Sequence, residues 1–168
     1  MPTTTATYAV KPIAPAVVAE LRLRDDSGNA PLLTIDVGGG SPLRCCLRAS
    51  EPGETLLLAS YAPLRRWAAE RGIDAGPYDE VGPVLLHPAP CAGPVHDGYP
   101  DDLRGAPRVL RAYNAAGRIV GGVVLAEDDS PEPAIEGLIA DPDVVVMHAR
   151  AVVFGCFTFA IERATQLG

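Results

Sequence analysis

Residues 144 to 163 place reactive side chains inside an otherwise apolar sequence, VVVMHARAVVFGCFTFAIER. Side chains two residues apart in a strand share a face, so His148 and Arg150 are expected on the same side. Cys156 begins the next apolar run, and pairing of the two runs would bring its thiol towards both side chains. A histidine can transfer protons, and a cysteine beside a base can act as a nucleophile. The sequence therefore predicts a catalytic pair, His148 and Cys156.

Arginines supply the substrate-binding part of this hypothesis. Arg150 follows the histidine directly on the same face, and Arg111 lies in a β-rich segment, residues 108–127, that could pair alongside. A guanidinium group binds a carboxylate or a phosphate through two parallel hydrogen bonds. We therefore expect an enzyme that binds an anionic or carbonyl substrate through these arginines and uses His148 for proton transfer.

Two other readings of the same residues stay open. His148 could be a hydrogen-bonded core residue, Cys156 an inert buried thiol, and the arginines surface groups at strand ends. The protein could also be a non-catalytic module that binds a metabolite or a protein partner with the same face. An enzyme needs a concave pocket in which a substrate can reach His148, whereas a binding module tolerates a sealed histidine.

A second group of reactive residues occupies a loop rich in proline and glycine. His87, Cys91 and His96 are separated by three and four intervening residues, and nitrogen and sulfur are zinc ligands. Zinc sites usually show ligand pairs at short spacing and a matching distant pair, which this segment lacks. Cys45 and Cys46 are adjacent and would point to opposite faces of a strand. We therefore expect no metal and no cofactor.

The elements that must position these residues follow from periodicity and turn signals. Hydrophobic patterning and proline or glycine boundaries predict strands, two helices, and a helical turn around Trp67. The predicted strands are 6–13, 31–37, 43–50, 54–61, 82–88, the hairpin 108–127, 143–150 and 154–163; the predicted helices are 14–24 and 130–142. Many hairpin-length strands with few helices predict an α+β fold, a mainly antiparallel sheet of about six or seven strands with two or three short helices.

Composition limits the class of protein. The 168 residues are expected to form one domain, and 21 acidic against 14 basic residues leave no basic stripe for nucleic acid. Neither a signal peptide nor an apolar stretch of membrane-spanning length is visible, so we expect no membrane partner and a cytoplasmic protein with free thiols. A small-molecule ligand is the expected partner, and the oligomeric state is left open.

Several landmarks together resemble the bacterial domain-of-unknown-function family 1203, over roughly residues 40 to 163. They are Pro42, Arg44, Leu47, Gly53-Glu54, Leu57-Leu58, Tyr61, Gly82-Pro83, Leu110 to Asn114, Gly117-Arg118, Asp141-Pro142, Val144, His148 to Arg150, Gly155 to Phe157 and Arg163. The resemblance adds Arg44 to the expected substrate-binding arginines and supports Arg111. Many members have a cysteine just before that first arginine, whereas Leu43 stands there in this chain. The resemblance implies a fold boundary and a choice of residues, but no reaction.

Overall fold

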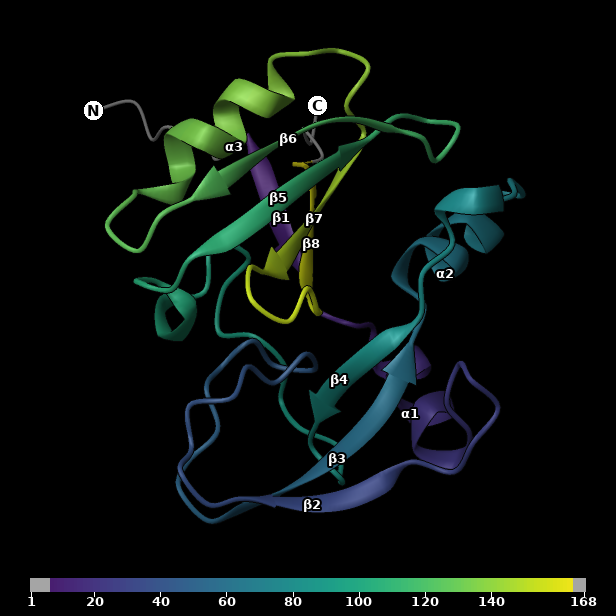
Figure 1. Ribbon diagram of the computed structural model, residues 1–168, viewed down its shortest axis with the longest axis vertical. Helices are drawn as coiled ribbons and strands as arrows, with labels where there is room; N and C mark the ends of the chain where they lie inside the picture. Colours follow the sequence, from purple (N-terminus) through teal and green to yellow (C-terminus); the bar gives the residue numbers. More distant parts are fainter. Residues whose placement is uncertain (1–6, 165–168) are drawn as a thin grey trace.

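The computed structural model describes residues 7–164, which form three α-helices and eight strands in two antiparallel sheets (Figure 1). The helices are α1 (Pro15–Leu23), α2 (Pro63–Glu70) and α3 (Pro131–Ile139). The strands are β1 (Tyr8–Lys11), β2 (Leu32–Asp36), β3 (Glu54–Tyr61), β4 (Gly82–Leu86), β5 (Arg108–Tyr113), β6 (Ile119–Leu125), β7 (Val146–Ala151) and β8 (Phe157–Arg163). The predicted α+β class with antiparallel pairing is confirmed, but the strands divide between two sheets.

The larger sheet has the order β1-β8-β7-β5-β6, and β7 is its central strand. Arg111 of β5 and Ala160 of β8 flank His148 in register, so the expected pairing of the two apolar runs is confirmed. A register shift lies between Ala149 and Arg150, after which Arg150 pairs with Phe157. The extra residue at this irregularity is Thr158 of β8.

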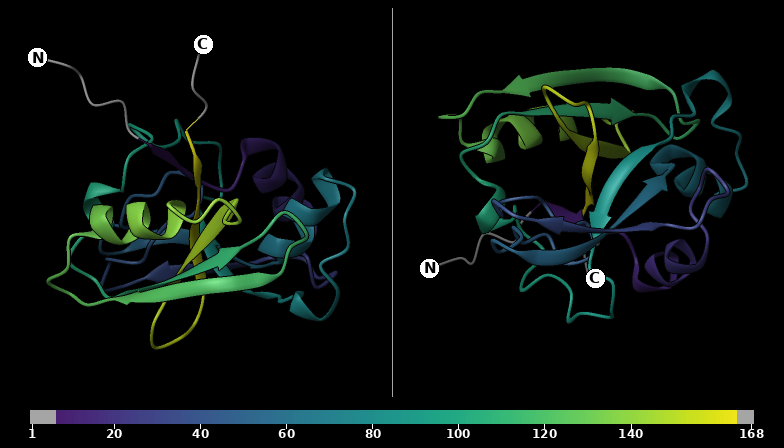
Figure 2. Two further views of the ribbon diagram at one scale, coloured as in Figure 1. Left: turned by 90° about the horizontal axis from the view of Figure 1, so that it is seen from above. Right: turned by 60° about the horizontal axis from the view of Figure 1, so that its bottom comes forward.

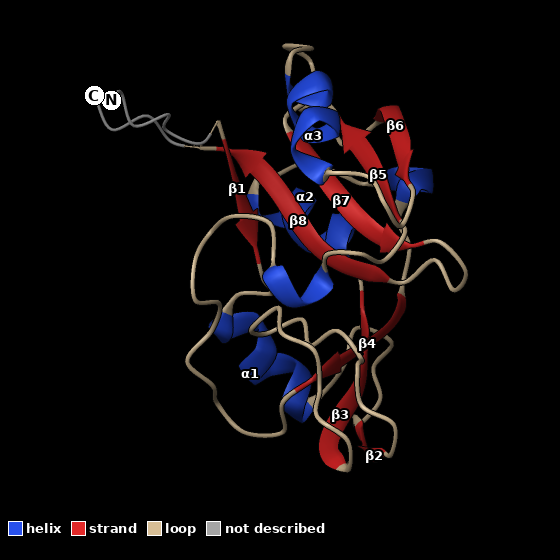
Figure 3. Ribbon diagram, turned by 90° about the vertical axis from the view of Figure 1, so that its left-hand side faces the viewer, coloured by secondary structure: helices blue, strands red, loops and turns tan. Residues whose placement is uncertain are grey.

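Both faces of β7 are covered, which explains its nearly continuous apolar sequence. Met147 and Ala149 pack in a core with Ile135 and Ile139 of α3. On the opposite face, Val146 packs with residues of α2. Figure 3 shows α3 lying across one side of the five-stranded sheet. His148, two residues after Val146, therefore faces the α2 side rather than the α3 side.

The smaller sheet has the order β2-β3-β4 and lies below the larger one in Figure 1. Its core also contains residues of α1 and Phe157 of β8, so an aromatic side chain of the larger sheet joins the two. The views in Figure 2 show the β5–β6 hairpin on the opposite side of the molecule from α1. Alternation of side chains with a period of two predicts a strand but not the strand with which it pairs. The sequence therefore did not indicate that the strands form two sheets.

The prediction of a strand over residues 43–50 is wrong. The chain folds back there, because the Leu47 N–H bonds to the Leu43 carbonyl and the Leu43 N–H bonds to the Arg48 carbonyl. Leu47 is buried and has a φ of +60°, a conformation that costs a non-glycine residue about 1–2 kcal/mol. Burial of the leucine side chain offsets that cost. The turn, rather than a strand, presents Cys45 and Cys46.

All three helices begin with proline at the first helical position, where the absent N–H costs no hydrogen bond. The helical turn expected around Trp67 is the helix α2. Within residues 7–164, none of the helices has both the length and the apolar character needed to cross a bilayer.

Candidate functional site

Two of the three predicted arginines lie where Glu80 can neutralise them. Arg111 Nη1 lies 3.0 Å from Glu80 Oε1, and Arg150 Nη2 lies 2.7 Å from Glu80 Oε2. Arg150 also donates from Nη1 to the Gly155 carbonyl at 2.9 Å. The structure thus brings together Arg111, His148 and Arg150 on one sheet face, as the sequence predicted. It adds a carboxylate that sequence reasoning did not include.

His148 is enclosed by aromatic rings. Its ring centroid lies 4.9 Å from that of Tyr113 and 5.1 Å from that of Phe157, and only 1% of the residue is exposed. Burial, followed by the positive charges of Arg150 and Arg111, lowers the pKa of His148 to about 3. The imidazole is therefore neutral near pH 7. Its Nδ1 is sealed from solvent and has no hydrogen-bond partner among the described residues.

Cys156 and Arg44 lie beside this face rather than on it. The half-buried Cys156 follows the end of β7, and its Sγ has a weak contact with the Phe154 carbonyl at 3.8 Å. Arg44 is buried, donates to the Phe157 carbonyl at 2.8 Å and to the Pro42 carbonyl at 2.6 Å, and has its pKa lowered to about 10 by burial. Arg44 therefore ties the 43–47 turn to β8.

Two cavities meet at Phe157. The first, here called the aromatic pocket, has a volume of about 380 Å³ and is lined by α1, α2, β1, β7 and β8, with Tyr61, Trp67, His148 and Phe157 in its wall. The second, the arginine cavity, measures about 270 Å³ and is lined by Glu80, Arg150 and Cys156 together with Tyr61 and Phe157. His148 and Cys156, the predicted catalytic pair, thus line different cavities.

Trp67 gives the aromatic pocket a second isolated polar atom. Its indole Nε1 is sealed from solvent and has no hydrogen-bond partner among the described residues. The guanidinium of Arg71 lies 4.2 Å from the Trp67 ring centroid and covers one face of the indole. The Tyr61 ring lies 5.3 Å from the Phe157 ring, and burial raises the pKa of Tyr61.

The sequence reasoning named Trp67 as a residue that could line a pocket mouth but did not connect it with His148, and it missed Tyr61 and Glu80 as site residues. Trp67 and Glu80 belong to a segment that the sequence marks only as irregular with one helical turn. Trp67 is the only tryptophan, and Tyr61 ends a strand two residues before Pro63. A single large aromatic within a short helix was the available signal, but no pattern in one sequence pairs it with a histidine 81 positions later.

A separate group of ligand-type atoms, here called the thiol–imidazole cluster, consists of Cys45, Cys46, His87 and Cys91. The three sulfurs and one ring nitrogen all lie within 4.8 Å of one another. His87 Nδ1 lies 3.4 Å from Cys45 Sγ and 3.8 Å from Cys46 Sγ. The sequence predicts no metal for His87 and Cys91, yet both residues meet two cysteines from the 43–47 turn.

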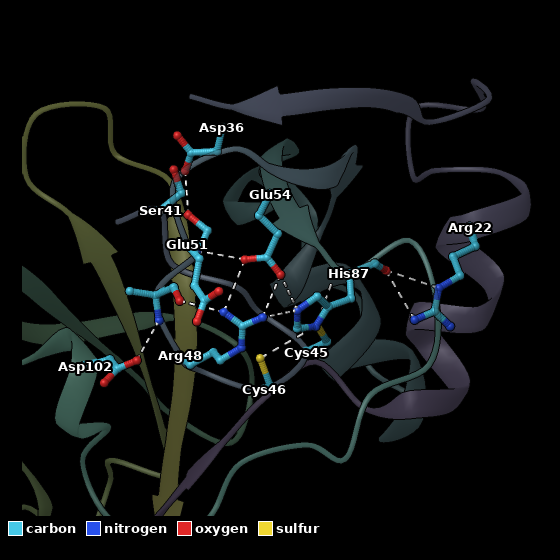
Figure 4. A network of polar contacts seen from close by, with 12 residues as sticks. Arg22, Asp36, Ser41, Cys45, Cys46, Arg48, Glu51, Glu54, His87 and Asp102 are labelled. Carbon is cyan, nitrogen blue, oxygen red and sulfur yellow. Dashed lines mark hydrogen bonds and ion pairs between the residues drawn. The ribbon is translucent and has the colours of Figure 1, made fainter. Parts of the chain in front are cut away.

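Polar side chains hold the other edge of the His87 ring (Figure 4). His87 Nε2 lies 3.1 Å from Glu54 Oε1 and 2.7 Å from Arg48 Nη2. Arg48 and Glu54 form a pair at 2.6 Å, and the hydrogen bond from Arg48 is the main reason that the pKa of Glu54 falls to about 2. His96, the third member of the sequence group, lies apart and contacts Asp101 at 3.0 Å.

Fold and site together define an α+β protein with two antiparallel sheets, an aromatic pocket beside α2 and a cluster of three thiols with one imidazole. The chain belongs to the family described as "Protein of unknown function (DUF1203)", whose model matches residues 40–163. The match confirms the family resemblance over the same residues. Comparisons with curated proteins and with solved structures give no match.

Proposed function

We propose that the protein binds a small, neutral molecule carrying a planar carbonyl or aromatic group in the aromatic pocket. The observation that carries this proposal is the pair of sealed polar atoms, Trp67 Nε1 and His148 Nδ1, in residues that line the same cavity. A buried polar atom without a partner costs about 1–3 kcal/mol. Both atoms are closed to solvent, so a ligand must first move the side chains that cover them; hydrogen bonds to the two atoms would then recover that cost.

Size and composition of the pocket support a small-molecule ligand. A volume of about 380 Å³ falls at the lower end of ligand sites, and such sites combine aromatic walls with few polar groups. Tyr61, Trp67 and Phe157 supply flat surfaces on which a planar ring can stack. The ligand that fits best is therefore of the size of one or two rings.

Charge pairing favours a neutral ligand over an anion. Arg66, on the pocket rim, is held by Asp26 at 2.7 Å and Glu20 at 2.7 Å. Arg111 and Arg150 share Glu80 in the same way. An anion would have to displace a carboxylate that already binds the guanidinium group through charge-assisted hydrogen bonds.

A binding role is better supported than a catalytic one. A general base works best when its pKa lies near the working pH, whereas the pKa of His148 is about 3. Proton transfer by His148 with Cys156 as nucleophile remains the second proposal, and it would require the two cavities beside Phe157 to join. We also propose a cytoplasmic location, which the four free cysteines within residues 7–164 support.

The test compares two probes that differ in charge. Benzamide is neutral and carries a carbonyl group on a ring, and benzoate carries a carboxylate on the same ring. We expect benzamide to bind with the weak affinity of so small a molecule and to change the fluorescence of Trp67, with benzoate binding less well. Because Trp67 is the only tryptophan, the emission reports on the pocket wall directly.

Three variants test whether benzamide binds in the aromatic pocket. By ligand-observed NMR, Trp67→Phe and His148→Gln should each weaken benzamide binding about fivefold, since each removes one hydrogen bond. His96→Gln is the matched control, because His96 lies in an exposed loop and contacts Asp101. Equal binding of benzamide and benzoate, or equal affinity in all three variants, would contradict the proposal.

A further inference from the structure

We propose that Cys45, Cys46, His87 and Cys91 bind one zinc ion, in a closed site that joins the 43–47 turn to the loop after β4. The aromatic pocket contains none of these residues. The inference is therefore independent of the proposed ligand binding. It also departs from the expectation that the sequence alone supports, which is a chain without metal.

Donor spacing is the first argument. Tetrahedral zinc has bonds of about 2.3 Å to sulfur and about 2.0–2.1 Å to nitrogen, so neighbouring ligand atoms stand about 3.5–3.8 Å apart. His87 Nδ1 lies 3.4 Å from one sulfur and 3.8 Å from another. All four donor atoms lie within 4.8 Å of one another, so small side-chain movements close the set around one ion. Three sulfurs and one imidazole nitrogen form a ligand set that structural zinc sites use.

Backbone structure holds two of the ligands. The turn at 43–47 is closed by hydrogen bonds at both ends, and Leu47 adopts its left-handed conformation at the turn's end. The turn brings two adjacent cysteines to the same imidazole, which a strand could not do. The His87 N–H also donates to Cys45 Sγ at 3.3 Å, which fixes that sulfur beside the start of the loop that carries Cys91.

The opposite edge of His87 carries the support that metal-bound histidines usually have. A zinc-ligating histidine normally donates its other ring N–H to a carboxylate or carbonyl, which fixes the tautomer. With zinc on Nδ1, Nε2 carries the proton and donates to Glu54 Oε1, 3.1 Å away. In that tautomer Nε2 cannot accept a hydrogen bond from Arg48 Nη2, which lies 2.7 Å away, so zinc binding requires Arg48 to move away from the ring while it keeps Glu54 as its partner.

Arg22 and two prolines position the loop that carries His87 and Cys91. Arg22, in the last turn of α1, donates to the His87 carbonyl at 3.3 and 3.4 Å and fixes the start of the loop. Pro88 and Pro90 restrict the three residues that separate His87 from Cys91. Three thiolates and a zinc ion carry a net charge of −1, and Arg48, which is also paired with Glu54, is the positive group beside them.

A structural role follows from where the ligands lie. The segment between β4 and β5 contains only one short helical turn, Asp101–Leu103, and otherwise lacks regular structure. A zinc ion would tie its beginning to the buried turn, because Cys45 and Cys46 are buried whereas Cys91 is exposed. The site has four protein ligands and no open position, so the proposed zinc is structural rather than catalytic.

The experiment measures metal content in the full chain, purified in the presence of zinc and a phosphine reductant and then dialysed against metal-free buffer. We expect about one zinc per chain by elemental mass spectrometry. Cobalt(II) in its place should give the visible and near-ultraviolet bands of a tetrahedral thiolate site. Cys91→Ser and His87→Ala should each lose the stoichiometric metal while keeping the circular dichroism spectrum of the wild type, because both residues lie in a loop.

Matched variants separate ligation from general loss of thiols or histidines. Cys156→Ser and His96→Ala remove the same side-chain types outside the cluster, and both should retain one zinc per chain. Glu54→Gln should retain the site but weaken zinc binding about 10–100-fold, the effect of losing a partner of a metal-bound histidine.

Three results would overturn the proposal. One is folded, reduced wild-type protein that retains neither zinc nor cobalt. Another is metal loss from Cys156→Ser or His96→Ala as complete as that from Cys91→Ser and His87→Ala. The third is a disulfide within the cluster whose reduction yields thiols that still bind no zinc.

Discussion

Two histidines show how differently the same side chain can be used in this protein. His148 lies between the rings of Tyr113 and Phe157, is 1% exposed, and is kept neutral by burial and by two nearby arginines. The partly exposed ring of His87 has thiols at one nitrogen and Glu54 at the other. The first environment suits contact with an uncharged ligand, and the second suits a cation.

The contrast reverses the expectation drawn from sequence context. A histidine in an apolar strand is conspicuous, so His148 was predicted as a proton-transfer group. A histidine in a proline-rich loop is not, so His87 was not predicted as a ligand. Burial, which makes His148 conspicuous, also lowers its pKa and weakens it as a base. His87 is only partly buried, and groups from other segments contact both of its ring nitrogens.

Acid sensitivity should show the largest difference between the environments. In the unfolded chain the pKa of His148 is 6.5, and in the folded protein it is about 3. Below about pH 6.5 the unfolded chain takes up a proton that the folded protein does not. The part of the free energy of unfolding that depends on His148 is therefore fully present above about pH 6.5 and is lost as the pH falls towards 3. At about pH 4 this histidine should lower the free energy of unfolding by about 3 kcal/mol relative to pH 7.

Urea unfolding at both pH values, in wild type and His148→Gln, measures this effect. Glutamine does not titrate, so the variant should lose about 3 kcal/mol less than the wild type between pH 7 and pH 4. The carboxylates that titrate in the same range are common to both proteins and cancel in the comparison. Parallel losses in the two proteins would mean that His148 is not held neutral.

Glu80→Gln should have the next largest effect, because it removes the charge that Arg111 and Arg150 share. Only 10% of the Arg150 side chain is exposed, whereas 47% of the Glu80 side chain is. We expect a loss of about 1–2 kcal/mol in the free energy of unfolding, between the values for surface and buried ion pairs. Glu127→Gln, at an exposed position after β6, is the control and should change stability by less than about 0.5 kcal/mol. Equal stabilities of the two variants would show that the arginines do not depend on Glu80.

Arg71→Gln should have a smaller effect, because Arg71 acts on the outer side of the aromatic pocket. Its guanidinium lies 4.2 Å from the Trp67 ring centroid and donates to the Trp67 carbonyl at 3.1 Å. Loss of a cation–π contact at a partly exposed site costs about 0.5–1 kcal/mol. Thermal unfolding measures the loss, and the Trp67 emission should shift as one face of the indole becomes uncovered. An unchanged emission spectrum would place Arg71 away from the ring in solution.

Local sequence signals predicted most helices and strands of the fold. The same signals do not predict the two sites, because the sites depend on contacts between distant segments. Proline at each helix start and the period of two in β3, β5, β7 and β8 act over a few residues, and the structure has these elements. The 43–50 strand failed because its alternation is equally compatible with a turn, and burial of Leu47 stabilises a backbone conformation that no local preference favours. Cys45 and Cys46 reach His87 only because of that turn.

The position of Arg111, His148 and Arg150 on one sheet face could be predicted, because the register of the paired strands fixes it. Arg111 opposite His148, and Arg150 two residues further, follow from antiparallel pairing of the strands. Glu80, and the meeting of Trp67 with His148, could not be predicted, since Glu80 and Trp67 come from the segment between β3 and β4, whose path over the sheet is set by tertiary packing. The thiol–imidazole cluster has the same origin, because its ligands come from segments about 40 residues apart.

Cys156→Ser should have the smallest effect, and it tests whether the two cavities beside Phe157 act as one site. The thiol makes one weak contact, with the Phe154 carbonyl at 3.8 Å, so serine should change the free energy of unfolding by less than about 0.5 kcal/mol. Benzamide affinity should also stay the same, because Cys156 lines the arginine cavity and His148 lines the aromatic pocket. A large loss of affinity would instead mean that Phe157 moves aside when a ligand binds. His148 and Cys156 would then face one substrate, and the catalytic pair predicted from the sequence would become the better account of the site.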